Sequence, residues 1–99
     1  MLEKPKPIRE IIEKTLAEYS GETVAGVAVY HIETTMGFNL GRAIEDPDGF
    51  LNALRQVYDG FVPLIEDKLC KNIAKEYGIK YKGEGFIEFV KKVRAALAV

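Results

Sequence analysis

The stretch ETVAGVAVYHIETTM, residues 22–36, decides whether this chain of 99 residues is all-helical or contains a sheet. Its valines, threonines and isoleucine are β-branched and favour a buried strand. A buried strand needs neighbouring strands, however, and the only other alternating segment is the short GIKYK at 78–82. The small residues Ala25, Gly26 and Ala28 would instead let a helix pack closely against a neighbour. We therefore predict a helix over 22–36, in which Gly26 costs about 1 kcal/mol of helix propensity, a cost that makes sense only if another backbone approaches it.

Apolar residues recur at helical spacing in four further segments, which predicts four more helices. The stripes span residues 8–19, 50–61, 62–77 and 86–97. Ser20 and Gly21 end the first of these helices, because glycine readily adopts the left-handed conformation of a helix C-terminus. The connections are short and imply mostly antiparallel neighbours. The expected fold is an all-α, five-helix orthogonal or antiparallel bundle with one short extended segment near residues 78–82.

Three breaks set the helix boundaries in the second half of the chain. Asp46 and Pro47 start the third helix, since aspartate caps early helix amides and proline suits the first helical position. Gly60 and Pro63 together end the third helix and start the fourth, because proline is tolerated only in a first turn. Gly78 then ends the fourth helix.

The length and the net charge of the chain limit the number of domains and the kinds of partner that we expect. By length the chain is one domain, so we expect a single helical domain over residues 1–99 with residues 1–7 as a loose lead-in. The 14 basic and 15 acidic residues give a net charge of −1, which provides no global field for nucleic acid or an anionic membrane. No run approaches the ~18 apolar residues of a membrane span, and the N-terminus has no apolar leader. We therefore expect a protein that is neither exported nor embedded in a membrane.

The sequence contains few residues that could form a catalytic or metal-binding site. The single cysteine, Cys70, and the single histidine, His31, can form neither an internal disulfide nor a structural zinc site. Cys70 lies between Leu69 and Ile73 on an apolar helix, as a small buried hydrophobic residue would. Ser20 is better explained as a helix-boundary residue than as a nucleophile, and no phosphate-binding glycine loop precedes a helix. We expect no enzymatic activity, no cofactor and no metal, and the reducing cytoplasm as the location.

Two surfaces are candidates for an interaction. On the helix over residues 22–36, small residues permit close contact and the larger side chains could supply a rim and an anchor. The candidate interaction residues are Gly26, Tyr30, His31 and Met36. The alternative is a phosphate-binding surface near the C-terminus, made of Lys80, Lys82, Lys91, Lys92 and Arg94. The first surface predicts a homodimer or a protein partner, and the second a nucleic acid.

Residues 30–81 carry a pattern of short motifs and no catalytic signature. The motifs are Tyr30-His31, Met36-Gly37-Phe38, Ile44-Glu-Asp-Pro47 with Phe50 and Leu54, Tyr58-Asp-Gly60, Leu64-Ile65-Glu66 and Glu76-Tyr-Gly-Ile-Lys-Tyr81. This pattern resembles the archaeal Nitrosopumilus output domain family, small helical domains found alone or appended to sensory modules. The resemblance covers about half of the chain. It implies a regulatory or interaction role in an archaeal cytoplasm, without a catalytic residue.

Together these features favour a non-enzymatic interaction or signalling-output module that acts through an apolar helix face. The alternative hypothesis is a nucleic-acid-binding regulator that uses the basic C-terminal helix, and its binding would weaken steeply with salt.

Overall fold

The structure is a computed structural model that describes residues 6–97. The described residues are 79% helical and include no strand, which confirms the expected all-α class. Their α-helices are α1 (Ile8–Ser20), α2 (Glu22–Tyr30), α3 (Pro47–Tyr58), α4 (Val62–Tyr77) and α5 (Phe86–Leu97). The expected count of five helical elements is slightly off, because three short helical segments accompany these helices. They are the π-helical turn η1 (His31–Thr35) and the 3-10 turns η2 (Leu40–Arg42) and η3 (Asp59–Phe61).

Residues 22–36, the stretch on which the fold class depends, are helical as predicted. α2 runs directly into η1, and its buried side is formed by Ala25, Ala28, Val29 and Ile32. The carboxylate of Glu33 in η1 accepts hydrogen bonds from the Arg9 guanidinium (Nε, 3.0 Å) and from the backbone amide of Leu40 (3.3 Å). These two contacts tie the π turn to α1 and to η2.

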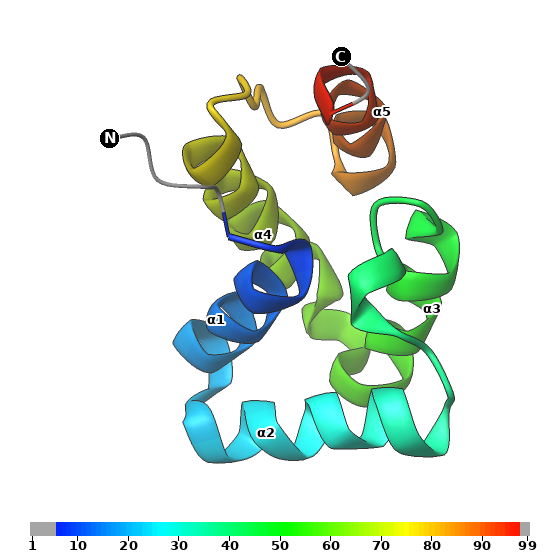
Figure 1. The fold of residues 1–99 in the computed structure, drawn as a ribbon. Coiled ribbons are helices and arrows are strands. Elements are labelled where there is room, and N and C mark those ends of the chain that lie inside the picture. Colours follow the sequence, from blue (N-terminus) through cyan, green and yellow to red (C-terminus); the bar gives the residue numbers. More distant parts are fainter. Residues whose placement is uncertain (1–5, 98–99) are drawn as a thin grey trace.

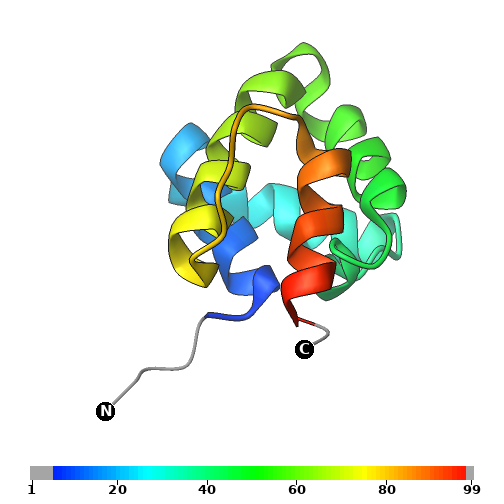
Figure 2. The same ribbon diagram turned by 90° about the horizontal axis from the view of Figure 1, so that it is seen from above.

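α2 runs across the other helices and not alongside them, which fits the orthogonal form of the expected bundle (Figure 1). α1 and α4 pack against each other, and α2 runs across the end of this layer beside α1 (Figure 1). α5 lies at the opposite end of the molecule from α2 (Figure 1) and packs on α3 and α4 (Figure 2). The start of α1 and the end of α5 are neighbours, since Ile8 and Leu97 line the same shallow depression.

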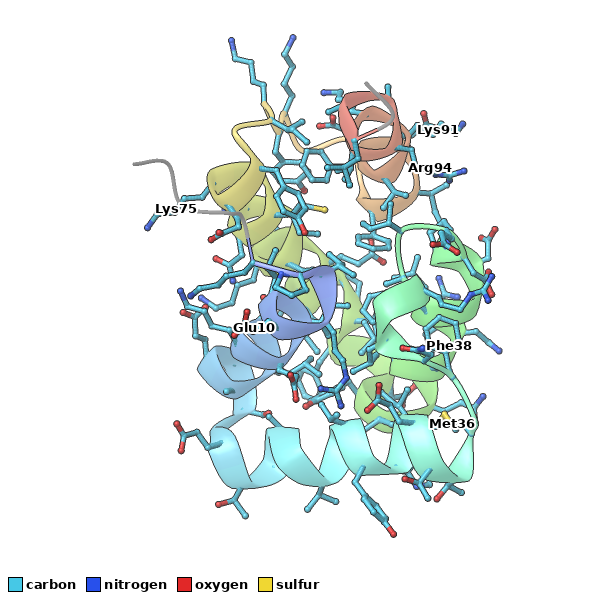
Figure 3. The ribbon with its side chains drawn as sticks, in the orientation of Figure 1. Glu10, Met36, Phe38, Lys75, Lys91 and Arg94 are labelled. Carbon is cyan, nitrogen blue, oxygen red and sulfur yellow. The ribbon has the colours of Figure 1, made fainter. Side chains whose placement is uncertain are left out.

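The connection between η1 and α3 folds back over the core. Met36 and Phe38 lead from the end of η1 toward α3 (Figure 3). Leu40 is fully buried and Ile44 nearly so, as expected for apolar residues that tuck under the helices. The loop therefore contributes side chains to the core and restrains the far end of η1.

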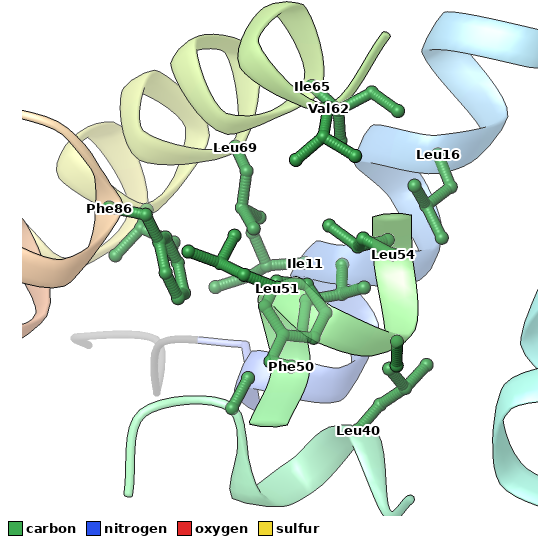
Figure 4. Close-up of a cluster of buried hydrophobic side chains, with 14 of the residues drawn as sticks. Ile11, Leu16, Leu40, Phe50, Leu51, Leu54, Val62, Ile65, Leu69 and Phe86 are labelled. Carbon is green, nitrogen blue, oxygen red and sulfur yellow. The ribbon is translucent and has the colours of Figure 1, made fainter. Parts of the chain in front are cut away.

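The core surrounds α3, which contributes Phe50, Leu51 and Leu54 (Figure 4). The rings of Phe50 and Phe86 lie 5.3 Å apart between centroids and join α3 to α5. The remaining large buried side chains come from α1, η1, η2, α4 and α5: Ile12, Leu16, Ile32, Leu40, Ile65, Leu69, Ile73, Phe89 and Val90. Each α-helix except α2 thus supplies at least one large, fully buried residue, and α2 supplies small ones.

A buried hydroxyl takes part in the polar contacts between α1 and α4. The Thr15 hydroxyl is fully buried and donates to the carbonyl oxygen of Ile11 (2.7 Å). The same hydroxyl oxygen accepts from the Asn72 side-chain amide (2.8 Å), which also donates to Glu18 (3.1 Å). The buried Thr15 hydroxyl both donates and accepts a hydrogen bond, so it is not left unsatisfied.

The corner between α3 and α4 differs from the prediction at Gly60. α3 ends at Tyr58, and the residue with positive φ is Asp59, with φ 48° and ψ −122°. Gly60 lies inside η3 and has no positive φ. A positive φ with this ψ is unfavourable for any residue with a side chain, so the chain places its strained backbone on Asp59, one residue before the predicted glycine. Pro63 stands in the first turn of α4, as predicted.

The other predicted boundaries hold. The Asp46 carboxylate accepts a hydrogen bond from the Gly49 amide (3.0 Å), and Pro47 is the first residue of α3. Gly78 ends α4 in the left-handed conformation, with φ 67°. The segment expected to be extended near 78–82 belongs to a loop that forms no strand in the described part of the chain.

The described start of the chain is attached to α4. The Lys6 amide donates to the Glu76 carboxylate (2.8 Å), and the Tyr77 hydroxyl donates to the Lys6 carbonyl oxygen (2.8 Å). Residues 1–5 of the expected lead-in lie outside the described residues. Within residues 6–97, the helices are too short or too polar to cross a lipid bilayer.

Candidate functional site

An open apolar groove lies where the end of α1, the outer flank of α2 and the α3–α4 corner meet. Its volume is about 940 Å³. The lining residues are Tyr19, Ser20, Thr23, Val24, Val27, Ala28, His31, Val57, Tyr58, Asp59 and Phe61. We call this feature the apolar groove. Its walls come from two parts of the chain, residues 19–31 and 57–61, that are distant in sequence.

The walls of the apolar groove carry large apolar side chains that are exposed to solvent. Val24 is 52% exposed, Val27 66% and Phe61 58%. Isolated exposed apolar residues are common on protein surfaces, whereas a contiguous group around a concave surface marks an interaction site. This group is the strongest functional feature among the described residues.

Aromatic side chains form the floor and one wall of the groove. Tyr19 packs edge-on against Tyr58, with 6.1 Å between ring centroids, and lies 6.3 Å from Phe61. The Ser20 hydroxyl donates to the Leu16 carbonyl oxygen (2.9 Å), so in its 3.1 Å contact with Tyr58 the tyrosine hydroxyl is the donor. Tyr58 is nearly buried and fixed at both its ring and its hydroxyl. The floor of the groove is therefore held in place before anything binds.

The lining of the groove contains few ionisable side chains. Apart from the tyrosines, its ionisable residues are His31 and Asp59, and it includes no lysine or arginine. The Ser20 hydroxyl donates to the Leu16 carbonyl oxygen and contacts the Tyr58 hydroxyl, and no hydrogen bond joins it to His31 or Asp59. The arrangement suits the binding of an apolar group with a few hydrogen bonds at its edges.

Cys70 lies outside the groove and is not prepared for reaction. Burial, together with the nearby carboxylates of Glu66, Asp67 and Glu84, raises the pKa of its thiol to about 12. A thiol with this pKa is protonated at neutral pH and is a poor nucleophile. In residues 6–97, no three histidine, cysteine, aspartate or glutamate side chains are grouped as metal ligands.

The four candidate interaction residues do not converge on one site. His31 lines the apolar groove, whereas Gly26 lies in a shallower depression on the opposite flank of α2, beside Glu13 and Ala17 of α1. Tyr30 is 67% exposed. Met36 lies at the far end of this helical stretch, near Phe38 and α3 (Figure 3).

Sequence reasoning missed the groove residues Tyr19, Val24, Val27 and Phe61. A usable signal was present on α2, because its valines lie on both sides and only one side can face the core of a surface helix. Val24 and Val27 are the valines left over once Ala25, Ala28 and Val29 are turned inward. Phe61 carried no such signal, since it continued the apolar stripe of the preceding helix.

The five basic residues near the C-terminus are also spread over different surfaces. Lys91 and Arg94 extend from the side of α5 that faces away from the loop containing Lys80 and Lys82 (Figure 3). Lys92 forms an ion pair with Glu84 and donates to the Lys80 carbonyl oxygen (3.2 Å). Lys91 forms an ion pair with the Glu88 carboxylate (3.2 Å). The structure does not gather these residues into one phosphate-binding surface.

Comparison of the chain with protein-family models, with curated proteins and with solved structures finds no match. The resemblance to the Nitrosopumilus output domain family therefore stays a prediction, and the apolar groove has to be interpreted from its own geometry.

Proposed function

We propose that this protein is a non-enzymatic interaction module that binds an apolar helix face in the apolar groove. The observation that carries the proposal is the exposure of Val24, Val27 and Phe61 around a concave surface of about 940 Å³. Fully burying a valine or phenylalanine side chain contributes about 1.5–3 kcal/mol, so covering these half-exposed residues would contribute roughly 3 kcal/mol. This gain favours a bound state over the open groove.

The rigid floor supports binding with a small loss of conformational freedom. Tyr58 is held by Tyr19 and by Ser20 in the unbound molecule, so a partner does not have to order it. The lining also fits a helix better than a polar ligand, because helix-in-groove recognition uses apolar anchors one turn apart.

For the cellular role, we extend the proposal from the resemblance of residues 30–81 to output domains. It supports a signalling-output function in an archaeal cytoplasm, in which binding at the groove passes a signal to another protein.

Fluorescence anisotropy with a labelled leucine–lysine peptide of about five helical turns tests the proposal. We expect the full chain to bind this peptide and Phe61→Asp to weaken the affinity about tenfold, equivalent to ~1.4 kcal/mol. Leu97→Asp is the matched control, since Leu97 is 56% exposed on α5, outside the groove lining. Both variants add the same negative charge.

A peptide that binds the Phe61→Asp and Leu97→Asp proteins equally well would show that the groove is not the receptor. No binding to the unmodified chain would contradict the proposed function directly. Far-UV circular dichroism of each variant separates a lost site from a lost fold.

A further inference from the structure

We propose that the apolar groove selects a helix whose apolar face is flanked by a lysine or arginine, and that the Asp59 carboxylate pairs with this cation. The inference rests on the proposed function and deepens it, since it names the chemistry of the helix that the groove binds. It gives Asp59 a role in specificity, whereas Val24, Val27 and Phe61 supply the apolar contact.

The lining of the groove carries charge of one sign. Among the described residues that line it, Asp59 is the one charged side chain when histidine is counted as neutral, and none is lysine or arginine. The wall segments, residues 19–31 and 57–61, add one further acid, Glu22, which lines the depression on the other flank of α2. A negative edge attracts a cationic partner and opposes the phosphate groups of nucleic acids and anionic lipids.

The Asp59 carboxylate is available for such a pair. The residue is exposed, and within residues 6–97 it forms no ion pair with a lysine or arginine, including Arg55 one turn earlier on α3. Glu18, near the end of α1, is by contrast already paired with Lys68 (3.7 Å). A cation on a bound helix therefore meets the Asp59 carboxylate without displacing an internal partner.

The backbone at Asp59 gives a second reason to assign a role to its carboxylate. At φ 48° and ψ −122°, a residue with a side chain is strained and glycine is not. Strained residues cluster at binding sites, and a functional residue commonly lowers the stability of a fold. The strained carboxylate lies in the same wall of the groove as Phe61, where a use in binding explains it.

The surroundings of Asp59 suit an ion pair at the edge of an apolar contact. Tyr58, the preceding residue, is nearly buried and hydrogen-bonded to Ser20, which restrains the chain at the start of the corner. Phe61, two residues later, is 58% exposed. The methylene stem of a lysine or arginine can cover part of the Phe61 ring while its cationic group stays in water and reaches Asp59.

Two peptides of the same length and leucine pattern test the charge of the bound helix, one with lysine and one with glutamine at the polar positions. Fluorescence anisotropy at low salt gives the affinity of the full chain for each peptide. We expect the leucine–lysine peptide to bind at least about threefold more tightly than the leucine–glutamine peptide. The difference should disappear in ~0.5 M NaCl, because exposed ion pairs are weak and are screened by salt.

Asp59→Asn assigns the effect to one carboxylate, since asparagine keeps the shape of the side chain and removes its charge. We expect this variant to bind the leucine–lysine peptide about threefold more weakly, as for one exposed ion pair, and the leucine–glutamine peptide with unchanged affinity. Asp48→Asn is the matched control, because Asp48 is exposed in the first turn of α3, at the other end of that helix, and should change neither affinity. Far-UV circular dichroism checks that both variants are folded.

Equal affinity of the unmodified chain for the two peptides, or an equal loss of both in Asp59→Asn, would overturn the inference. The proposed function would still stand if Phe61→Asp weakened the binding of both peptides. Binding of neither peptide would contradict the proposed function itself. A dimer of the chain that sedimentation velocity detects and the leucine–lysine peptide dissociates would identify a second copy as the occupant of the groove, and would also overturn the inference.

Discussion

Replacing Asp59 by glycine should stabilise the protein, because a left-handed backbone conformation is imposed there on a residue with a side chain. At φ 48° and ψ −122°, a non-glycine residue carries about 1–3 kcal/mol of strain. Glycine removes this strain but costs about 0.5–1 kcal/mol through the greater freedom of the unfolded chain. The expected net gain is about 1 kcal/mol in the free energy of unfolding, or roughly 4–8 °C in Tm for a domain of this size.

Urea denaturation followed by circular dichroism measures this gain, and Asp59→Ala is the matched control. Alanine also removes the carboxylate but keeps the Cβ atom, so it should not give the gain. An unchanged or lower urea midpoint for Asp59→Gly, or an equal rise for Asp59→Ala, would refute the assignment of backbone strain to this corner.

Three further predictions concern the core, the α4–α5 loop and the thiol. Leu54→Ala should lower the free energy of unfolding by about 2–5 kcal/mol in urea denaturation, since Leu54 is fully buried and leaves a cavity. The hydrogen bond from Lys92 lowers the pKa of Glu84 to about 2, so the stability from this pair should be present above about pH 4.5 and lost between about pH 4.5 and 2. Lys92→Met should remove that part of the acid dependence in denaturation curves measured across this range. Cys70, with a pKa of about 12, should react with a thiol reagent at pH 8 only after urea unfolds the chain; rapid labelling of the folded protein would contradict its burial.

The fold class was predictable because a strand over residues 22–36 would need neighbouring strands, and the sequence offers only the short alternating segment at 78–82. Residues 22–36 had strand-like composition, but no second strand was available, and the structure confirms the helix. The π turn at its end was not predictable. It is accompanied by contacts of Glu33 with Arg9 and Leu40, which are 24 and 7 residues away, and periodicity in a single segment contains no information about such contacts.

The α3–α4 corner shows the limit of residue-type rules. Glycine at position 60 signalled a break correctly, but the three-dimensional path of the chain placed the unusual dihedral angles on Asp59. Composition identifies where a chain turns, and packing decides which residue makes the turn.

The candidate site was the least predictable part. His31 was selected for its chemistry and does line the groove, whereas Val24, Val27 and Phe61 looked like ordinary core residues in their stripes. Their exposure depends on how α1, α2 and the α3–α4 corner meet, which only the tertiary arrangement determines. The basic residues near the C-terminus were grouped by sequence, but Lys92 is engaged by Glu84 and the others extend from different surfaces.

The buried Thr15 hydroxyl and the Asn72 amide also determine the shape of the binding surface at a distance. Apolar side chains on two packed helices tolerate small sliding movements, but a hydrogen bond of 2.8 Å inside the interface is lost when the helices shift by even part of a turn. This hydrogen bond therefore fixes the position of α1 along α4. Because Tyr19 and Ser20 lie at the end of α1 and line the groove, the same hydrogen bond also fixes the position of that wall of the groove.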